Sequence, residues 1–235
     1  SDLMNIWSKE NLVKTMTNSS WETSLGIMQI NPKYTNEGKR EVLKEFFSDK
    51  KLGDTHKPVA VTSYDIEKRL PVLLTSYGDP EVSVVDAGDA TSAAPVYYPT
   101  AQVGDRFLID GGIVANHPVL HGYVEAKKLY PESDLVVLSV GTGLNKRPLK
   151  GKDSKKWGLI GWMMHDLFGL MVESSMDHEL AEELIGKNYL RINSPLGRVN
   201  RRLDDNSDSN IERIISMGEG WWDEFGERTL LLLGK

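Results

Sequence analysis

The run Leu135-Val136-Val137-Leu138-Ser139-Val140-Gly141-Thr142-Gly143 indicates the class of fold. Its first six residues are almost all apolar, which is typical of a strand buried on both faces in a parallel sheet. The glycines that follow end this strand. A helix is predicted over residues 118–129 before the strand, and a long helical region over residues 157–185 after it. A buried strand between two helices is typical of an α/β protein.

The rest of the chain continues this alternation of strands, loops and helices. Two apolar, β-branched runs at residues 57–66 and 69–77 are separated by a charged pair and predict a hairpin or two adjacent strands. Further helices are predicted over residues 37–48, 83–94 and 210–233, and short strands over residues 106–109 and 188–193. We therefore expect a single domain over residues 1–235, built as a three-layer α/β/α sandwich with a mainly parallel central sheet.

The composition excludes several classes of function. The 235 residues hold 28 Lys and Arg against 34 Asp and Glu, a net charge of −6 that repels nucleic-acid phosphates. Cysteine is absent, so the chain has no disulfide, no thiolate metal site and no cysteine nucleophile. The most apolar stretch, residues 157–172, is too short to span a bilayer and carries His165 and Asp166 in its middle. We interpret it as core, with an acyl-chain groove or a lipid-facing lid as the alternative.

No cofactor or metal site is expected. Gly141-Thr142-Gly143 fails the dinucleotide-binding fingerprint, because Lys146 occupies the position of the next required glycine. A nucleotide-binding α/β domain is therefore disfavoured. His117 and His121 have a helical spacing that suits a metal, but no third ligand pattern lies nearby, which favours a solvated or capping pair.

Ile109-Asp110-Gly111-Gly112 places an acidic residue at the end of a predicted strand, followed by two glycines that tolerate positive φ. The carboxyl ends of strands in a parallel sheet face the ligand crevice. A carboxylate there is placed to meet a substrate or a nucleophile. Asp-Gly is also a common turn dipeptide, so a purely structural turn is the alternative.

Three ordered stretches carry a resemblance to a known family. They are Ala90-Thr91-Ser92-Ala93-Ala94-Pro95 with Tyr97, Tyr98 and Pro99, then Asp110-Gly111-Gly112 with Asn116 and Pro118, then 138–143. Weaker matches lie at residues 31–34, 63–66 and 188–191. In their order and spacing the chain resembles the patatin-like lipid acyl hydrolases over nearly its whole length.

This resemblance implies a serine hydrolase of phospholipase or lysophospholipase type, with a Ser-Asp dyad and without histidine, metal or cofactor. Asp110 takes the role of the base in that dyad, and Gly111 and Gly112 shape its turn. An ordinary carboxylate is too weak a base to hold a serine proton. It must therefore accept the proton as attack develops, helped by partial burial that raises its pKa.

The chain departs from the family pattern at the nucleophile. It contains no Gly-x-Ser-x-Gly elbow and no glycine-rich oxyanion loop before it. We therefore expect the C-terminal part of the family fold, with the N-terminal part and its serine absent. Ser92 and Ser139 lack the strand-turn-helix context of an activated hydroxyl, so this chain alone should have little or no hydrolase activity.

Two hypotheses of function follow. In the first, the chain is most of a lipid acyl hydrolase whose serine comes from an upstream segment. In the second, it is a shortened, non-catalytic relative that binds lipid or a protein partner. The expected partners are a lipid or fatty acyl ester, a membrane surface contacted peripherally, and either a second copy of the chain or a complementing N-terminal segment. We expect it in the cytoplasm or peripherally at a membrane surface.

Overall fold

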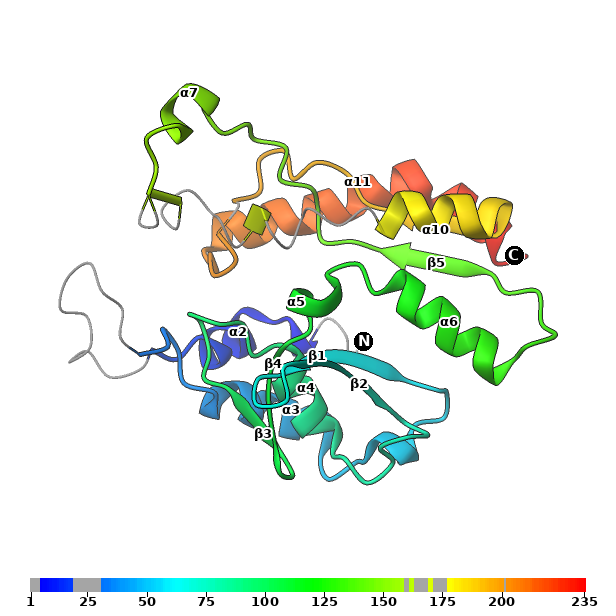
Figure 1. The fold of residues 1–235 in the computed structure, drawn as a ribbon. Coiled ribbons are helices and arrows are strands. Elements are labelled where there is room, and N and C mark those ends of the chain that lie inside the picture. Colours follow the sequence, from blue (N-terminus) through cyan, green and yellow to red (C-terminus); the bar gives the residue numbers. More distant parts are fainter. Residues whose placement is uncertain (1–4, 19–30, 159–160, 163–168, 171–176, 201) are drawn as a thin grey trace. The chain divides into compact units, whose positions relative to one another are not determined.

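The computed structural model describes residues 5–18, 31–158, 161–162, 169–170, 177–200 and 202–235 (Figure 1). The chain divides into two compact units, Ser1–Ala115 and Asn116–Lys235.

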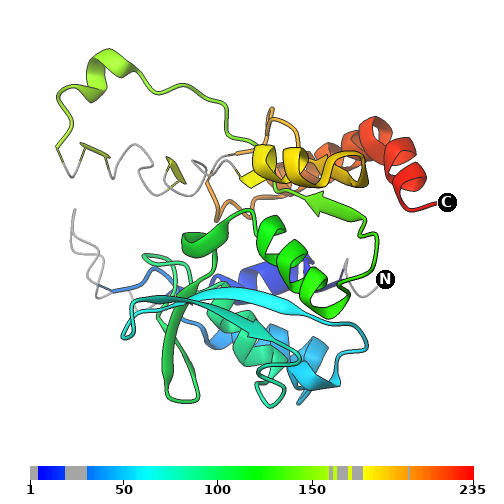
Figure 2. The same cartoon turned by 45° about the vertical axis from the view of Figure 1, so that its right-hand side comes forward.

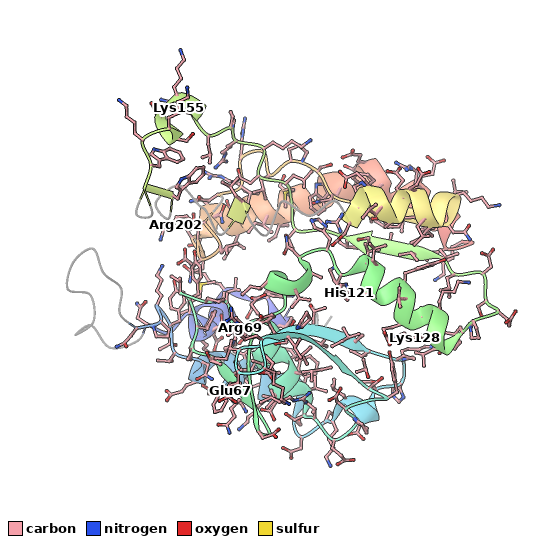
Figure 3. All side chains as sticks on the ribbon, in the orientation of Figure 1. Glu67, Arg69, His121, Lys128, Lys155 and Arg202 are labelled. Carbon is pink, nitrogen blue, oxygen red and sulfur yellow. The ribbon has the colours of Figure 1, made fainter. Side chains whose placement is uncertain are left out.

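The first unit is built on a four-stranded sheet with the order β2-β1-β4-β3. Its strands are β1 (Ala60–Asp65), β2 (Leu70–Thr75), β3 (Ala101–Val103) and β4 (Arg106–Asp110). All neighbouring strands are antiparallel. The turn that joins β1 and β2 holds Glu67 and Arg69 (Figure 3). It is fastened by Asp65, whose Oδ1 accepts hydrogen bonds from the amides of Glu67 and Lys68.

The helices of the first unit are α2 (Lys9–Thr15), α3 (Glu37–Phe47), η2 (Leu52–Asp54), α4 (Val84–Thr91) and α5 (Gly112–Ala115). Helix α4 packs against β1, β3 and β4 of the sheet and also against α3, as the second view shows (Figure 2). Its small side chains allow this close approach, because Ala87, Ala90 and the following Ala93 are all buried. Ser83 caps the helix and accepts a hydrogen bond from the amide of Asp86.

The second unit contains α6 (Val119–Leu129), β5 (Val137–Val140), α7 (Gly151–Ser154), α10 (Asp177–Ile185), η3 (Gly186–Asn188), β6 (Tyr189–Ile192) and α11 (Asp208–Leu232). Strands β5 and β6 pair in parallel, with Val137 opposite Tyr189. A small core joins α6, α10 and the two strands through Val119, Ala181 and Tyr189. No described helix is both long and apolar enough to cross a membrane.

The structure confirms a mixed α/β protein and corrects the predicted sheet. We expected a mainly parallel central sheet, but the described strands form an antiparallel four-stranded sheet and one parallel pair. The lengths of the connections explain the difference. Residues 66–69 and 104–105 are the only links within the two hairpins, whereas a parallel crossover needs about a dozen residues or more. The parallel strands β5 and β6, by contrast, are separated by residues 141–188, a segment long enough for a crossover.

The prediction that residues 135–140 are buried on both faces is also wrong. Leu138 and Val140 have relative exposures of 36% and 63%. Among the described residues β5 pairs with β6 alone, so one edge of β5 has no strand beside it. The predicted helical region 157–185 is described only in part. Helix α10 covers its end, while His165, Asp166 and most of the apolar stretch lie outside the described residues.

Candidate active site

Asp110 is the last residue of β4, and the backbone around it is tied to two neighbouring elements. It lies opposite Ser63 of β1 in the antiparallel register. Its amide donates a hydrogen bond to the carbonyl oxygen of Ala93 (3.1 Å), and the amide of Gly111 donates to that of Thr91 (3.2 Å). The Asp110-Gly111 turn is therefore fastened to the C-terminal end of α4.

The two carboxylate oxygens of Asp110 differ in their surroundings. Oδ1 accepts a hydrogen bond of 2.6 Å from the amide of Gly112, the first residue of α5. On the Oδ2 side, no donor from the described residues forms a hydrogen bond, and no described cation forms an ion pair with this carboxylate. One oxygen is thus held in place while the other is open to a further partner.

Burial raises the pKa of Asp110 above its ordinary value. Two weaker influences lower this pKa: the hydrogen bond from Gly112 and the positive charge of Lys39. Burial raises the pKa of a carboxyl group because the charged form loses its hydration. A raised pKa makes the carboxylate a better proton acceptor, which is the property that general-base chemistry requires.

Gly111 is required by the close approach of the turn to β1. A Cβ atom at this position would lie 2.1 Å from the carbonyl oxygen of Thr62 and 2.3 Å from its Oγ1. No side chain fits in that space without moving the backbone of β1. Gly112 contributes through its amide, so both glycines lie in the turn that follows Asp110.

Structural hydrogen bonds engage the hydroxyl groups of three serines. Ser63 is fully buried and donates to the carbonyl oxygen of Ile109 (2.6 Å). Ser92 donates to the carbonyl oxygen of Gly88 (2.7 Å), as a helical serine commonly does. In the second unit, Ser139 Oγ accepts a hydrogen bond from Arg191 (2.6 Å). None of the three sits on a strand-turn-helix elbow.

The structure also shows a buried ionic cluster that sequence reasoning missed. Lys39 and Asp89 are 6% and 1% exposed, and Lys39 Nζ lies 2.9 Å from Asp89 Oδ1. That oxygen accepts no well-aligned hydrogen bond, so the contact is mainly ionic. Arg40 joins the cluster through Asp89 Oδ2 (3.0 Å) and Asp86 Oδ1 (2.7 Å). A signal was present, because carboxylates within the small, apolar run 83–94 require partners when buried.

The histidine and glycine candidates of the second unit show no ligand site. Nδ1 of His117 accepts from Arg191, and His121 is exposed on α6 (Figure 3). The amide of Gly143 donates to Asn193 Oδ1 (2.9 Å), so it is not available to a nucleotide phosphate. Within the described part of the chain, no three His, Asp or Glu side chains are grouped to hold a metal ion.

The Asp110-Gly111-Gly112 turn lies within a part of the chain that matches a known family. The family model of the patatin-like phospholipases matches residues 1–122. The chain belongs to this family.

Individual relatives support the assignment. The chain is 29% identical to Patatin-like protein 4 of Arabidopsis thaliana, over 85% of this chain and 60% of that protein. It is 35% identical to a cGAMP-activated phospholipase of Pseudomonas aeruginosa, over 68% of this chain and 51% of that protein. It is 26% identical to a potato protein named "Probable inactive patatin-3-Kuras 1", over 83% of this chain and 62% of that protein. The chain thus spans between about half and about three fifths of these relatives.

Proposed function

We propose that this chain carries the aspartate half of the Ser-Asp dyad of a lipid acyl hydrolase. The single observation that supports it best is the carboxylate of Asp110, which has one oxygen held by Gly112 and the other without a described donor. Because no Gly-x-Ser-x-Gly elbow occurs in the 235 residues, the nucleophilic serine comes from polypeptide outside them. The two units together form the C-terminal part of one patatin-like domain.

The proposed reaction is hydrolysis of an acyl ester in a phospholipid or lysophospholipid. The serine hydroxyl attacks the ester carbonyl while its proton passes to Asp110, and a tetrahedral oxyanion forms. The intermediate collapses to an acyl-serine, and the departing alkoxide takes the proton from Asp110. A water molecule then repeats the sequence, giving up its proton to Asp110 and releasing the fatty acid and the free serine.

Two features of the turn suit Asp110 to this role. Burial raises its pKa, so the carboxylate gains affinity for the proton that it must accept. The hydrogen bond from Gly112 fixes the orientation of the carboxylate, which preserves a productive geometry. The name of the Pseudomonas aeruginosa relative, a phospholipase, supports phospholipids as the substrate class.

The test is ester hydrolysis by the product of the complete reading frame that encodes this chain. Asp110→Asn should lower kcat by at least about 10²-fold, because it removes the general base. Asp105→Asn, an exposed position in the turn between β3 and β4, is the matched control and should retain activity. Undiminished turnover by Asp110→Asn would contradict the proposed role.

A non-catalytic relative that binds lipid or a protein partner is the second candidate function. It is favoured by the lack of the serine elbow in these residues and by the Solanum tuberosum relative whose name includes the words "Probable inactive". A fluorophosphonate probe separates the two candidates. Labelling of a serine in the complete product supports the hydrolase, whereas a complete product that is folded and unlabelled supports the binding module.

A further inference from the structure

We propose that Lys39 is a positioning residue for Asp110, holding the C-terminal end of α4 in the place where it receives the Asp110-Gly111 turn. This inference rests on the role of Asp110 proposed above. It assigns a function to a buried cation from α3 that lies far from Asp110 in the sequence.

Among the described residues, the side-chain nitrogen of Lys39 contacts the C-terminal end of α4 and the aromatic ring of Tyr98, which follows that helix. Its Nζ donates to the carbonyl oxygens of Asp89 (3.2 Å) and Ser92 (3.2 Å) and to Ser92 Oγ (3.1 Å). It also lies 4.2 Å from the centre of the Tyr98 ring. The ion pair with Asp89 completes this environment. The side chain of Lys39 therefore binds both backbone and side-chain atoms at the end of α4.

The same segment of α4 receives the catalytic turn. The carbonyl oxygens of Thr91 and Ala93 accept hydrogen bonds from Gly111 and Asp110, and the carbonyl oxygen between them, that of Ser92, accepts from Lys39. Three consecutive carbonyl groups are thus shared between the turn and the lysine. Any displacement of residues 91–93 would move the backbone of Asp110 with them.

The free energy of a buried ion pair favours positioning, rather than stabilisation of the fold, as the role of the charged Lys39 side chain. A buried ion pair often contributes no more to stability than apolar side chains of similar volume, because both charges lose their hydration. Burial accordingly lowers the pKa of Lys39, opposed mainly by Asp89, while nearby Arg40 lowers it further. A charged lysine offers what an apolar side chain lacks: donors aimed at the α4 carbonyls and a positive charge that acts on Asp110.

The charge has a consequence for the chemistry. Burial raises the pKa of Asp110, and the positive charge of Lys39 limits that rise. The positive charge of Lys39 thereby favours the ionised form of the Asp110 carboxyl group, which is the form that accepts a proton. Lys39 thus holds the backbone that positions Asp110 and also lowers the pKa of its carboxyl group, without touching the substrate.

The test uses the product of the complete reading frame that encodes this chain and does not rely on the nucleophilic serine. Lys39→Met removes the donors and the charge, and Lys44→Met, at an exposed position of the same helix, is the matched control. Hydrogen exchange by NMR should be at least about tenfold faster at the amides of Asp110 and Gly111 in Lys39→Met, since the bonds lost are charge-assisted. Amides of the β1–β2 ladder should keep their protection, and Lys44→Met should change neither group.

A carboxyl titration of Asp110 supplies the second readout. The pKa of Asp110 should rise in Lys39→Met and stay unchanged in Lys44→Met, because only the first substitution removes a nearby positive charge. A merely structural role would speed exchange at all core amides alike, and that result would overturn the proposal. An unchanged titration of Asp110 would likewise contradict the action of the Lys39 charge on this carboxyl group.

A second variant keeps the proposal testable if Lys39→Met does not fold. If Lys39→Met does not fold, Lys39→Gln keeps a donor and removes the charge, and the same two measurements apply to it. Failure of both variants to fold would overturn the proposal, because Lys39 would then serve the fold as a whole. Since none of these measurements uses ester hydrolysis, their outcome is independent of the Asp110→Asn test of the proposed function.

Discussion

Gly111 lies so close to Thr62 that a Cβ atom would come within 2.1 Å of the threonine carbonyl oxygen. Gly111→Ala should therefore destabilise the chain by about 1–3 kcal/mol or more, as overpacking does when backbone must move. Urea unfolding measures this cost. Gly122→Ala, in α6 with no atom near the added Cβ, should instead stabilise by about 0.5–1 kcal/mol. Equal effects of the two substitutions would contradict the argument.

The buried carboxylate of Asp110 should destabilise the folded chain at neutral pH. Burial raises its folded pKa, so the folded chain holds the proton more tightly than the unfolded chain does. The resulting stabilisation is fully present below the unfolded pKa and is lost as the pH rises through the folded pKa. Asp110→Asn keeps an acceptor for Gly112 and carries no charge, so it should be more stable than the parent at neutral pH.

That difference should shrink as the pH falls toward the unfolded pKa of Asp110, and urea unfolding across an acidic to neutral series measures it. Asp105→Asn, at an exposed site, is the control for loss of one negative charge. A stability difference that does not change with pH would show that charge burial is not its cause.

Ser83 should stabilise α4 through its cap. Its hydroxyl oxygen accepts a hydrogen bond of 2.9 Å from the amide of Asp86. Ser83→Ala should lower the free energy of unfolding by about 1 kcal/mol, the usual cost of removing such a cap. Ser207 is the N-cap of α11 (Asp208–Leu232) and its side chain makes no capping hydrogen bond. Ser207→Ala should therefore lower the free energy of unfolding much less. The prediction fails if thermal unfolding shows equal losses for both variants.

His117 should make the second unit sensitive to acid. Its Nδ1 accepts a hydrogen bond of 2.7 Å from Arg191, and arginine can only donate, so this nitrogen carries no proton. Burial, followed by the charge of Arg191, lowers the pKa of His117 below its ordinary value of 6.5. Stability linked to this group is therefore present above the unfolded pKa and lost as the pH falls below it.

His117→Gln should remove that dependence, which tryptophan fluorescence during urea unfolding can follow at neutral and mildly acidic pH. His121→Gln, on the exposed surface of the same helix, should preserve it. Loss of the acid sensitivity in both variants, or in neither, would assign it to another group.

Local patterns predicted many elements of this chain, but not their pairing. The helix at residues 37–48 appears as α3, and the runs at residues 57–66 and 69–77 form the β1–β2 hairpin. These elements were predictable because periodicity and turn residues act over a few positions. The mainly parallel sheet was a wrong prediction, since it was generalised from one apolar strand. The exposure of Val140 likewise depends on which elements pack on the faces of β5.

The amino-acid sequence alone indicated a turn at Asp110-Gly111-Gly112. It could do so because the preference of these residues for a turn is local. Only the tertiary structure decided that Lys39 and Asp89 meet inside the first unit, and that burial raises the pKa of Asp110. The physical reason is the range of the forces. A turn follows from neighbouring residues, whereas hydration and charge at a buried atom depend on every element packed around it.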